Sequence, residues 1–75
     1  MGQKTFPRAY TAIIKQHGLW WNGWIVEVAG VNGQEKSREK LMESLRIALG
    51  EAIDMNRELA LHAAGSDYVE VEITL

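Results

Sequence analysis

The sequence contains no cysteine, which excludes disulfide bridges, thiolate metal ligands and cysteine nucleophiles and fits a reducing compartment. We therefore expect the protein in the cytoplasm. It has two histidines, His17 and His62, too far apart in sequence to indicate a metal site. No apolar run approaches the ~20 residues that cross a bilayer. The opening MGQKTFPR resembles neither a secretion nor a lipidation signal, and we expect residues 1–8 to be a flexible entry segment.

Basic residues are too few for a protein that mainly binds phosphate backbones. Eight basic and ten acidic residues give a net charge of -2, which suits a basic partner better than a nucleic acid. The 75 residues allow one domain, with no separate DNA-binding domain. A chain this short buries a modest share of its surface, so its core is small.

The first half of the chain carries strand patterns. The segment AYTAIIKQ (residues 9–16) is rich in β-branched and aromatic residues and ends at the turn His17-Gly18. Both of its faces are partly apolar and need cover, so we expect a homodimer or higher oligomer. A second strand is predicted from Trp20 or Trp21 to Val28, and a short third strand or extended link over residues 31–36.

A long helix and a final strand are predicted next. Ser37 is a good N-cap, Glu39 favours the helix dipole, and Gly65 is placed to end the helix. One broad apolar stripe runs along this helix, formed by Leu41, Met42, Leu45, Ala48, Leu49, Ala52, Ile53, Met55, Asn56, Leu59 and Ala60. Residues 68–75 then alternate apolar and polar, which is typical of a half-buried strand. The predicted class is α+β with the order β-β-β-α-β, an antiparallel-dominated sheet with the helix on one face.

The acidic residues are weak candidates for catalysis. Clustered carboxylates on a sheet can bind Mg²⁺ for nuclease chemistry, and Glu27, Glu35, Glu70 and Glu72 lie on or near predicted strands. No spacing among them indicates such a site, and solvated surface carboxylates are the ordinary interpretation. We therefore predict no enzyme activity and no catalytic, cofactor-binding or metal-binding residues.

The tryptophans are better candidates for recognition. Trp24 is expected to pack in the core, whereas Trp20 and Trp21 lie beside a turn and are expected to be partly exposed at an interface. Base stacking is a weaker alternative, because the neighbours Asn22, Gly23 and Glu27 are not basic. The residues predicted to contact a partner are Trp20, Trp21, Asn22, Glu70 and Glu72.

Three passages between Tyr10 and Ala64 carry a family resemblance. They are YTAIIKQHGLWWNGWIVEV, AGVNGQEKSREKL and SLRIALGEAIDMNRELALHAA, and their order resembles the HicB family of antitoxins from type II toxin–antitoxin systems. The resemblance implies a β-β-β-α-β fold similar to a partial ribonuclease H-like domain without its acidic metal site. This chain has Ala29 where many relatives have a proline before the turn glycine, so the turn is expected to be less rigid.

The function that the resemblance implies is stoichiometric inhibition of a small, basic, HicA-like toxin that cleaves mRNA. Longer relatives add a helix-turn-helix or ribbon-helix-helix domain for operator binding, and nothing of this kind follows the helix here, so direct DNA binding is not expected. A stand-alone nucleic-acid-binding or regulatory domain of the same fold is an alternative, and a degenerate nuclease is a second. We expect neither a cofactor nor a membrane association.

Overall fold

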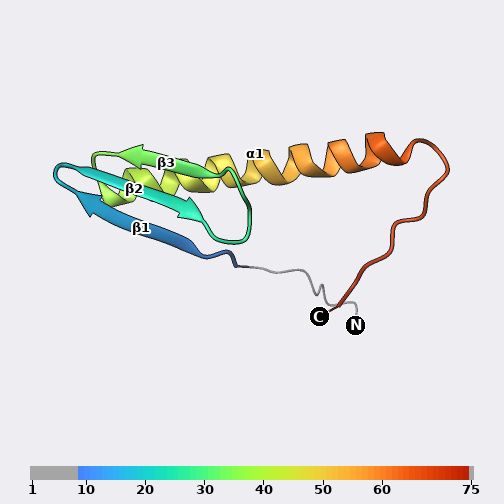
Figure 1. Ribbon diagram of the computed structural model, residues 1–75, viewed down its shortest axis with the longest axis horizontal. Helices are drawn as coiled ribbons and strands as arrows, with labels where there is room; N and C mark the ends of the chain where they lie inside the picture. The colour runs from blue at the N-terminus through green and yellow to red at the C-terminus, as the bar shows by residue number, and fades with distance from the viewer. Residues whose placement is uncertain (1–8, 75) are drawn as a thin grey trace.

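Three strands and one long helix form the described part of the chain. The computed structural model describes residues 9–74; the predicted entry segment, residues 1–8, lies outside the described residues, as does Leu75. The elements are β1 (Ala12–His17), β2 (Trp20–Ile25), β3 (Asn32–Glu35) and α1 (Arg38–Ala64), in the order β-β-β-α (Figure 1). The predicted α+β class and the short third strand are confirmed.

The sheet is antiparallel throughout and has the order β1-β2-β3. Gly18 has a φ of 64°, which suits the tight turn from β1 to β2. Ala12 lies opposite Ile25 and Ile14 opposite Gly23, while Gly23 lies opposite Gly33 of β3. Because side chains alternate along strands, these residues share one face of the sheet, which we call the inner face.

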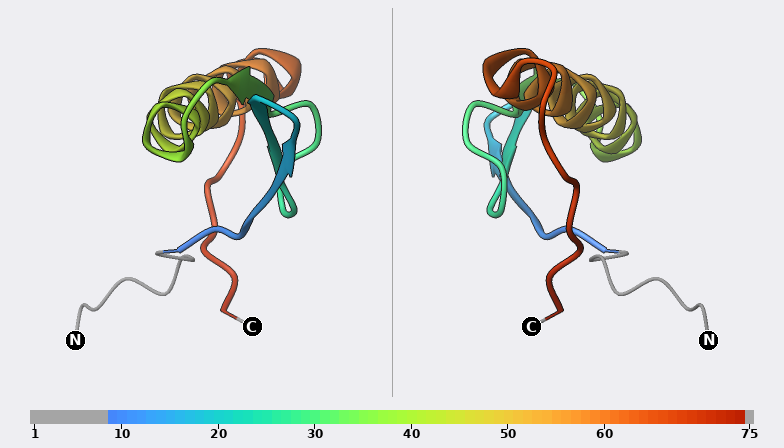
Figure 2. Two further views of the ribbon diagram at one scale, coloured as in Figure 1. Left: turned by 90° about the vertical axis from the view of Figure 1, so that its left-hand side faces the viewer. Right: turned by 90° about the vertical axis from the view of Figure 1, so that its right-hand side faces the viewer.

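The helix covers the inner face. Ile25, Val31, Leu41 and Leu45 are the buried core among the described residues, and Leu41 is 0% exposed. A Cβ on Gly23 would stand 3.1 Å from Leu41 Cδ2, so the paired glycines let the helix approach the sheet closely. The partly buried residues packed against this core are Tyr10, Ala12, Ile14, Trp21, Val28, Ala48, Leu49 and Ala52. Seen along its length, the molecule has α1 on one side of the sheet and no helix on the other (Figure 2).

Both helix ends are capped as predicted. The Ser37 hydroxyl accepts a hydrogen bond from the Lys40 N–H at 3.1 Å. Gly65 has a φ of 81° and its N–H bonds to the carbonyls of Leu61 and His62 at 3.2 Å. The helix boundaries therefore follow from local sequence, through a hydroxyl N-cap and a glycine C-cap.

The helix is much longer than the sheet beneath it. Its 27 residues span ~40 Å, whereas the six residues of β1 span ~20 Å. Ala52 is the last helix residue that packs against the core. We call residues 53–64 the overhang, and all of them except Leu61 are exposed. The radius of gyration, 15.7 Å, exceeds the ~11 Å of a compact chain of this length.

The predicted final strand does not form within the described residues. Residues 68–74, which we call the tail, contain no strand, and Val69, Val71 and Ile73 are 84%, 76% and 74% exposed. The physical reason is position: the tail leaves the far end of the overhang, away from the sheet (Figure 1). Among residues 9–74 no strand pairs with it, so its alternating pattern does not become part of the sheet.

Candidate partner-binding surface

Among the described residues, the face of the sheet opposite the helix has no element packed on it and carries two exposed tryptophans. We define the outer face by its alternating positions: Ile13, Lys15 and His17 of β1, Trp20, Asn22 and Trp24 of β2, and Asn32 and Gln34 of β3. Apart from Asn22, which is half-buried, all of these residues are exposed. A single helix can cover one face of a sheet, so these side chains are left to solvent or to a partner.

Two tryptophans dominate this outer face. Trp20 and Trp24 are 40% and 43% exposed, and they are four residues apart on β2, a separation of ~13 Å along the strand. Asn22 lies between them. The Lys36 ammonium sits 5.3 Å from the centroid of the Trp20 ring, a cation–π contact that orients the ring. Trp24 stands opposite Ile13, so aromatic and aliphatic surface adjoin.

The structure corrects the assignment of two tryptophans. Trp24, expected in the core, is exposed on the outer face, whereas Trp21 is half-buried and packs against the core. The reason is strand alternation: Trp21, Gly23 and Ile25 point toward the helix, so Trp24 must point away. The signal that identifies the inner face is the Gly23–Gly33 pair, because a leucine of the helix fills the space that two missing side chains leave.

The five residues predicted to contact a partner do not form one surface. Trp20 and Asn22 share the outer face, and Trp21 lies on the inner face. Glu70 and Glu72 belong to the tail, below the overhang and away from the sheet (Figure 1). The Arg57 guanidinium donates to both carboxylate oxygens of Glu70 at 3.1 Å. Both side chains of this ion pair are exposed to solvent, so the pair contributes little to holding the tail in place.

Several residues on the outer face or just beyond the strands that form it were not among the predicted contacts. Ile13 and Val26 are exposed, and Lys15 and Lys36 flank the tryptophans. The sequence places Ile13 next to the equally apolar Ile14, and periodicity alone does not say which of the two faces the helix. The strand register decides, because Ile14 pairs with Gly23.

Two acids considered for catalysis serve the fold instead. Glu35 accepts a hydrogen bond from the Ser44 hydroxyl at 2.7 Å, which ties β3 to the first turns of α1. Glu27 accepts from the Thr11 N–H at 2.8 Å, and hydrogen bonding to Thr11 lowers the pKa of the Glu27 carboxyl below its ordinary value. Across residues 9–74, no group of three or more histidines or acids is placed to hold a metal ion.

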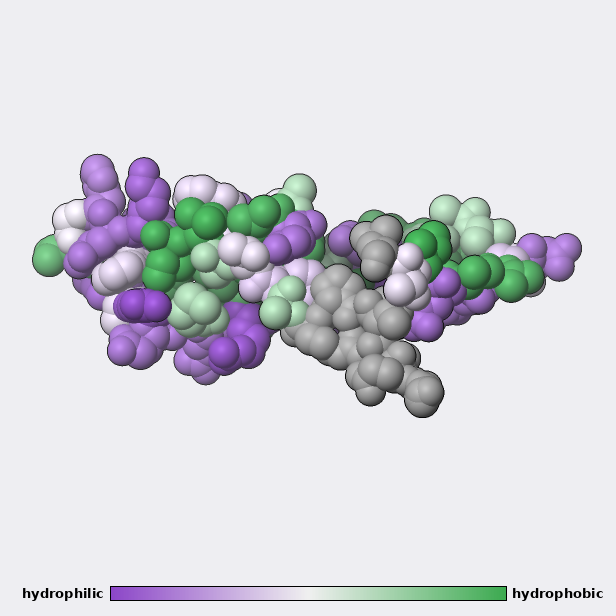
Figure 3. Space-filling model, turned by 90° about the horizontal axis from the view of Figure 1, so that it is seen from below, coloured by the Kyte–Doolittle hydropathy of each residue, from purple (hydrophilic) through white to green (hydrophobic). Residues whose placement is uncertain are grey.

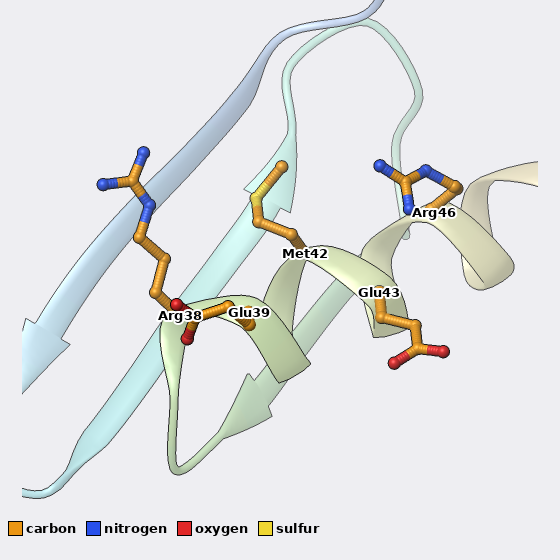
Figure 4. Close-up of a pocket in the computed structure, with 5 residues that line it drawn as sticks. All are labelled: Arg38, Glu39, Met42, Glu43 and Arg46. Atoms are coloured by element: carbon orange, nitrogen blue, oxygen red, sulfur yellow. The ribbon is translucent and has the colours of Figure 1, made fainter.

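Two hollows lie along the helix. The first is lined by Arg38, Glu39, Met42, Glu43 and Arg46, all from the first turns of α1 (Figure 4). Its charges are balanced, so it favours no charged ligand. The second is an apolar groove between the helix and the edge of β1, lined by Tyr10, Ala12, Ile25, Met42, Leu45, Arg46 and Leu49. We call it the edge groove.

Comparison of the chain with known protein families, with characterised proteins and with solved structures finds no significant match. In the part of the chain that the structure describes, no helix has the length and apolar character needed to span a membrane. The class of protein is therefore given by the fold alone, a three-stranded antiparallel sheet followed by one long helix.

Proposed function

We propose that this chain is an antitoxin-like binding protein that neutralises a small, basic, HicA-like toxin by forming a stoichiometric complex with it. The observation that carries the proposal is the open outer face, where Trp20 and Trp24 lie exposed beside Ile13. Tryptophan is enriched at the energetic centres of protein interfaces, because it buries a large apolar area with little loss of side-chain entropy. The β-β-β-α order matches the first four elements of the fold that the resemblance to HicB antitoxins implies, and the net charge of -2 suits a basic partner.

The geometry supports recognition by a sheet face. The outer face offers two large rings separated by a half-buried amide, and polar side chains of β1 and β3 surround them. An interface centre of this kind is typically apolar and ringed by polar groups that exclude water. The net charge of -2 favours a basic partner, and the acidic residues that supply it lie outside the outer face.

Binding to a HicA-like toxin tests the proposal. Replacing both Trp20 and Trp24 with alanine is expected to weaken the complex by at least ~100-fold, the loss typical of hot-spot tryptophans. Isothermal titration calorimetry measures the affinity, and rescue of growth on co-expression measures neutralisation. Ile47→Ala is the matched control, because Ile47 is exposed on the helix and far from the sheet's outer face. Wild-type affinity in the double variant would contradict the assigned surface, and absence of any complex would contradict the function.

A second candidate function is binding of single-stranded nucleic acid. The observation that favours it is the presence of Lys15, His17 and Lys36 on the same surface as Trp20 and Trp24. Single-strand binders combine aromatic stacking platforms with nearby cations. Quenching of tryptophan fluorescence by single-stranded RNA, weakened by added salt and by Trp24→Ala, would establish this function. Unchanged fluorescence would leave the antitoxin-like proposal as the better one.

A further inference from the structure

The free edge of β1 lies beside an unfilled apolar groove. β1 pairs with β2 on one side, and within residues 9–74 no strand pairs with its other edge. The edge groove runs between this edge and α1, with Ala12 and Leu49 among its lining residues. Seen from the β1 side, hydrophobic residues are exposed in the half of the molecule that contains the sheet (Figure 3). A strand added to β1 would place every second side chain in the groove.

The tail has the side-chain pattern that this position requires. Val69, Val71 and Ile73 alternate with Glu70 and Glu72. If the three apolar side chains enter the edge groove, the two glutamates emerge on the outer face, because side chains alternate across a strand. Lys15 of β1 lies on that outer face, and opposite charges on neighbouring strands stabilise their pairing. The alternation of the tail and the charge of its glutamates therefore both suit a strand paired with the free edge of β1.

The tail of the same chain cannot fill the position over its full length. From Ala52 to Ala64 the helix advances ~18 Å beyond the core. An extended chain returning from Gly65 covers that distance in ~5 to 6 residues. Within one chain, Val69 and Val71 would thus lie alongside the overhang and could not enter the edge groove. A second copy has no such limit.

We infer that the tail of one copy pairs with the β1 edge of a second copy, and that the reciprocal exchange forms a homodimer. Each tail inserts Val69, Val71 and Ile73 into the partner's edge groove and sets Glu70 and Glu72 near Lys15. The exchange is isologous, since each copy supplies one tail and one groove. The exchange breaks the exposed Arg57–Glu70 pair, which contributes little stability. The inference does not rest on the proposed function, which concerns the outer face of the sheet.

Sedimentation equilibrium of the full chain over a range of concentrations provides the first test. We expect a mass of twice 8.4 kDa. Val71→Asp puts a carboxylate into the groove and is expected to raise the dimer dissociation constant by at least ~100-fold, with the helical circular dichroism unchanged because Val71 is exposed in the single chain. Val26→Asp is the matched control, because Val26 is exposed outside the tail, and it is expected to remain dimeric. A monomeric wild type, or a Val71→Asp dimer as tight as wild type, would overturn the inference.

Cysteine crosslinking provides a second readout that distinguishes exchange from pairing within one chain. The natural chain has no cysteine, so every thiol is an introduced one. Chains carrying Lys15→Cys are mixed with chains carrying Glu72→Cys or, for the other register, Glu70→Cys. Exchange predicts a disulfide between the two different chains. Double variants with both cysteines that oxidise within one chain at all concentrations would show self-pairing instead and would refute the exchange.

Discussion

The two halves of α1 share one continuous apolar stripe but have different surroundings. From Leu41 to Ala52 the apolar stripe packs on the inner face of the sheet, and Leu41 and Leu45 are fully enclosed. From Ile53 onward the stripe continues with Met55 and Leu59, yet these residues are exposed. The difference is the length of the sheet, which ends before the helix does. An apolar stripe therefore identifies a helix face that packs against something, but it does not show whether the same chain or another chain buries that face.

The comparison predicts that truncation of an apolar side chain lowers stability far more in the first half than in the overhang. Leu41→Ala is expected to lower the free energy of unfolding by ~2–5 kcal/mol, because it removes a fully buried side chain and leaves a cavity against Gly23 and Gly33. Leu59→Ala in the overhang is expected to change it by less than ~0.5 kcal/mol in the single chain. Urea unfolding of both variants measures the contrast. Equal losses of unfolding free energy would mean that the overhang is buried to the same extent as the first half of the helix.

Alanine substitutions at two glycines are expected to change the stability of the fold in opposite directions. Alanine at Gly23 would bring a Cβ to 3.0 Å from the Ile13 carbonyl oxygen, a backbone atom that cannot move aside, so we expect a loss of ~1–3 kcal/mol. At Gly50 a Cβ meets nothing within 4 Å. Gly50→Ala therefore removes the conformational cost of a helical glycine and is expected to stabilise by up to ~1 kcal/mol. Thermal unfolding distinguishes the two, and a stabilised Gly23→Ala variant would contradict the close approach of the helix.

Substitutions of the N-cap residue test the end of the helix that packs on the sheet. Ser37→Ala removes the acceptor of the Lys40 N–H bond and is expected to cost ~1 kcal/mol. Ser37→Asp restores an acceptor and adds a charge favourable to the helix dipole, so it is expected to keep wild-type stability. Urea unfolding at neutral pH measures both. A loss in Ser37→Asp as large as that in Ser37→Ala would argue against a capping role.

The smallest expected effect concerns Glu27, which closes the start of the sheet. Its pKa is lowered below 4.5 by hydrogen bonding to Thr11, so its ionised form stabilises the folded state. That contribution is complete above the ordinary pKa and disappears as the pH falls through the lowered value. The stability difference between wild type and Glu27→Gln should therefore be constant near neutral pH and shrink below pH 4.5. Glu51→Gln on the exposed helix surface controls for the loss of one charge.

Local signals made most of the fold predictable from the sequence. Ser37 and Gly65 mark the helix ends, and β-branched and aromatic runs mark the first two strands. The sequence did not show which element packs against each apolar face. Trp21 and Trp24 are equally hydrophobic neighbours on opposite faces, and register separates them. The alternation of residues 68–74 is real, but a strand also needs an edge within reach, which depends on the length of the helix before it.

The candidate surface was predictable to a smaller extent. Trp20 and Asn22 could be chosen because they follow the β1–β2 turn, and they do lie together on the outer face. The contributions of Lys15 and Lys36 could not be foreseen. They come from a different strand and from the end of β3, and only the antiparallel register brings them beside Trp20 and Trp24.

The order of strands in the sheet has a consequence for the timing of folding. Each strand pairs with its neighbour in the sequence, and α1 follows directly after β3. Contacts so local close small loops, and chains dominated by them fold rapidly. The sheet and the first half of the helix can thus form as soon as they leave the ribosome, whereas a tail exchanged between copies must wait for a bimolecular encounter. If the tails are exchanged as we propose, newly made chains at low concentration expose Val69–Ile73 to proteases, and accumulation of the protein itself protects these residues.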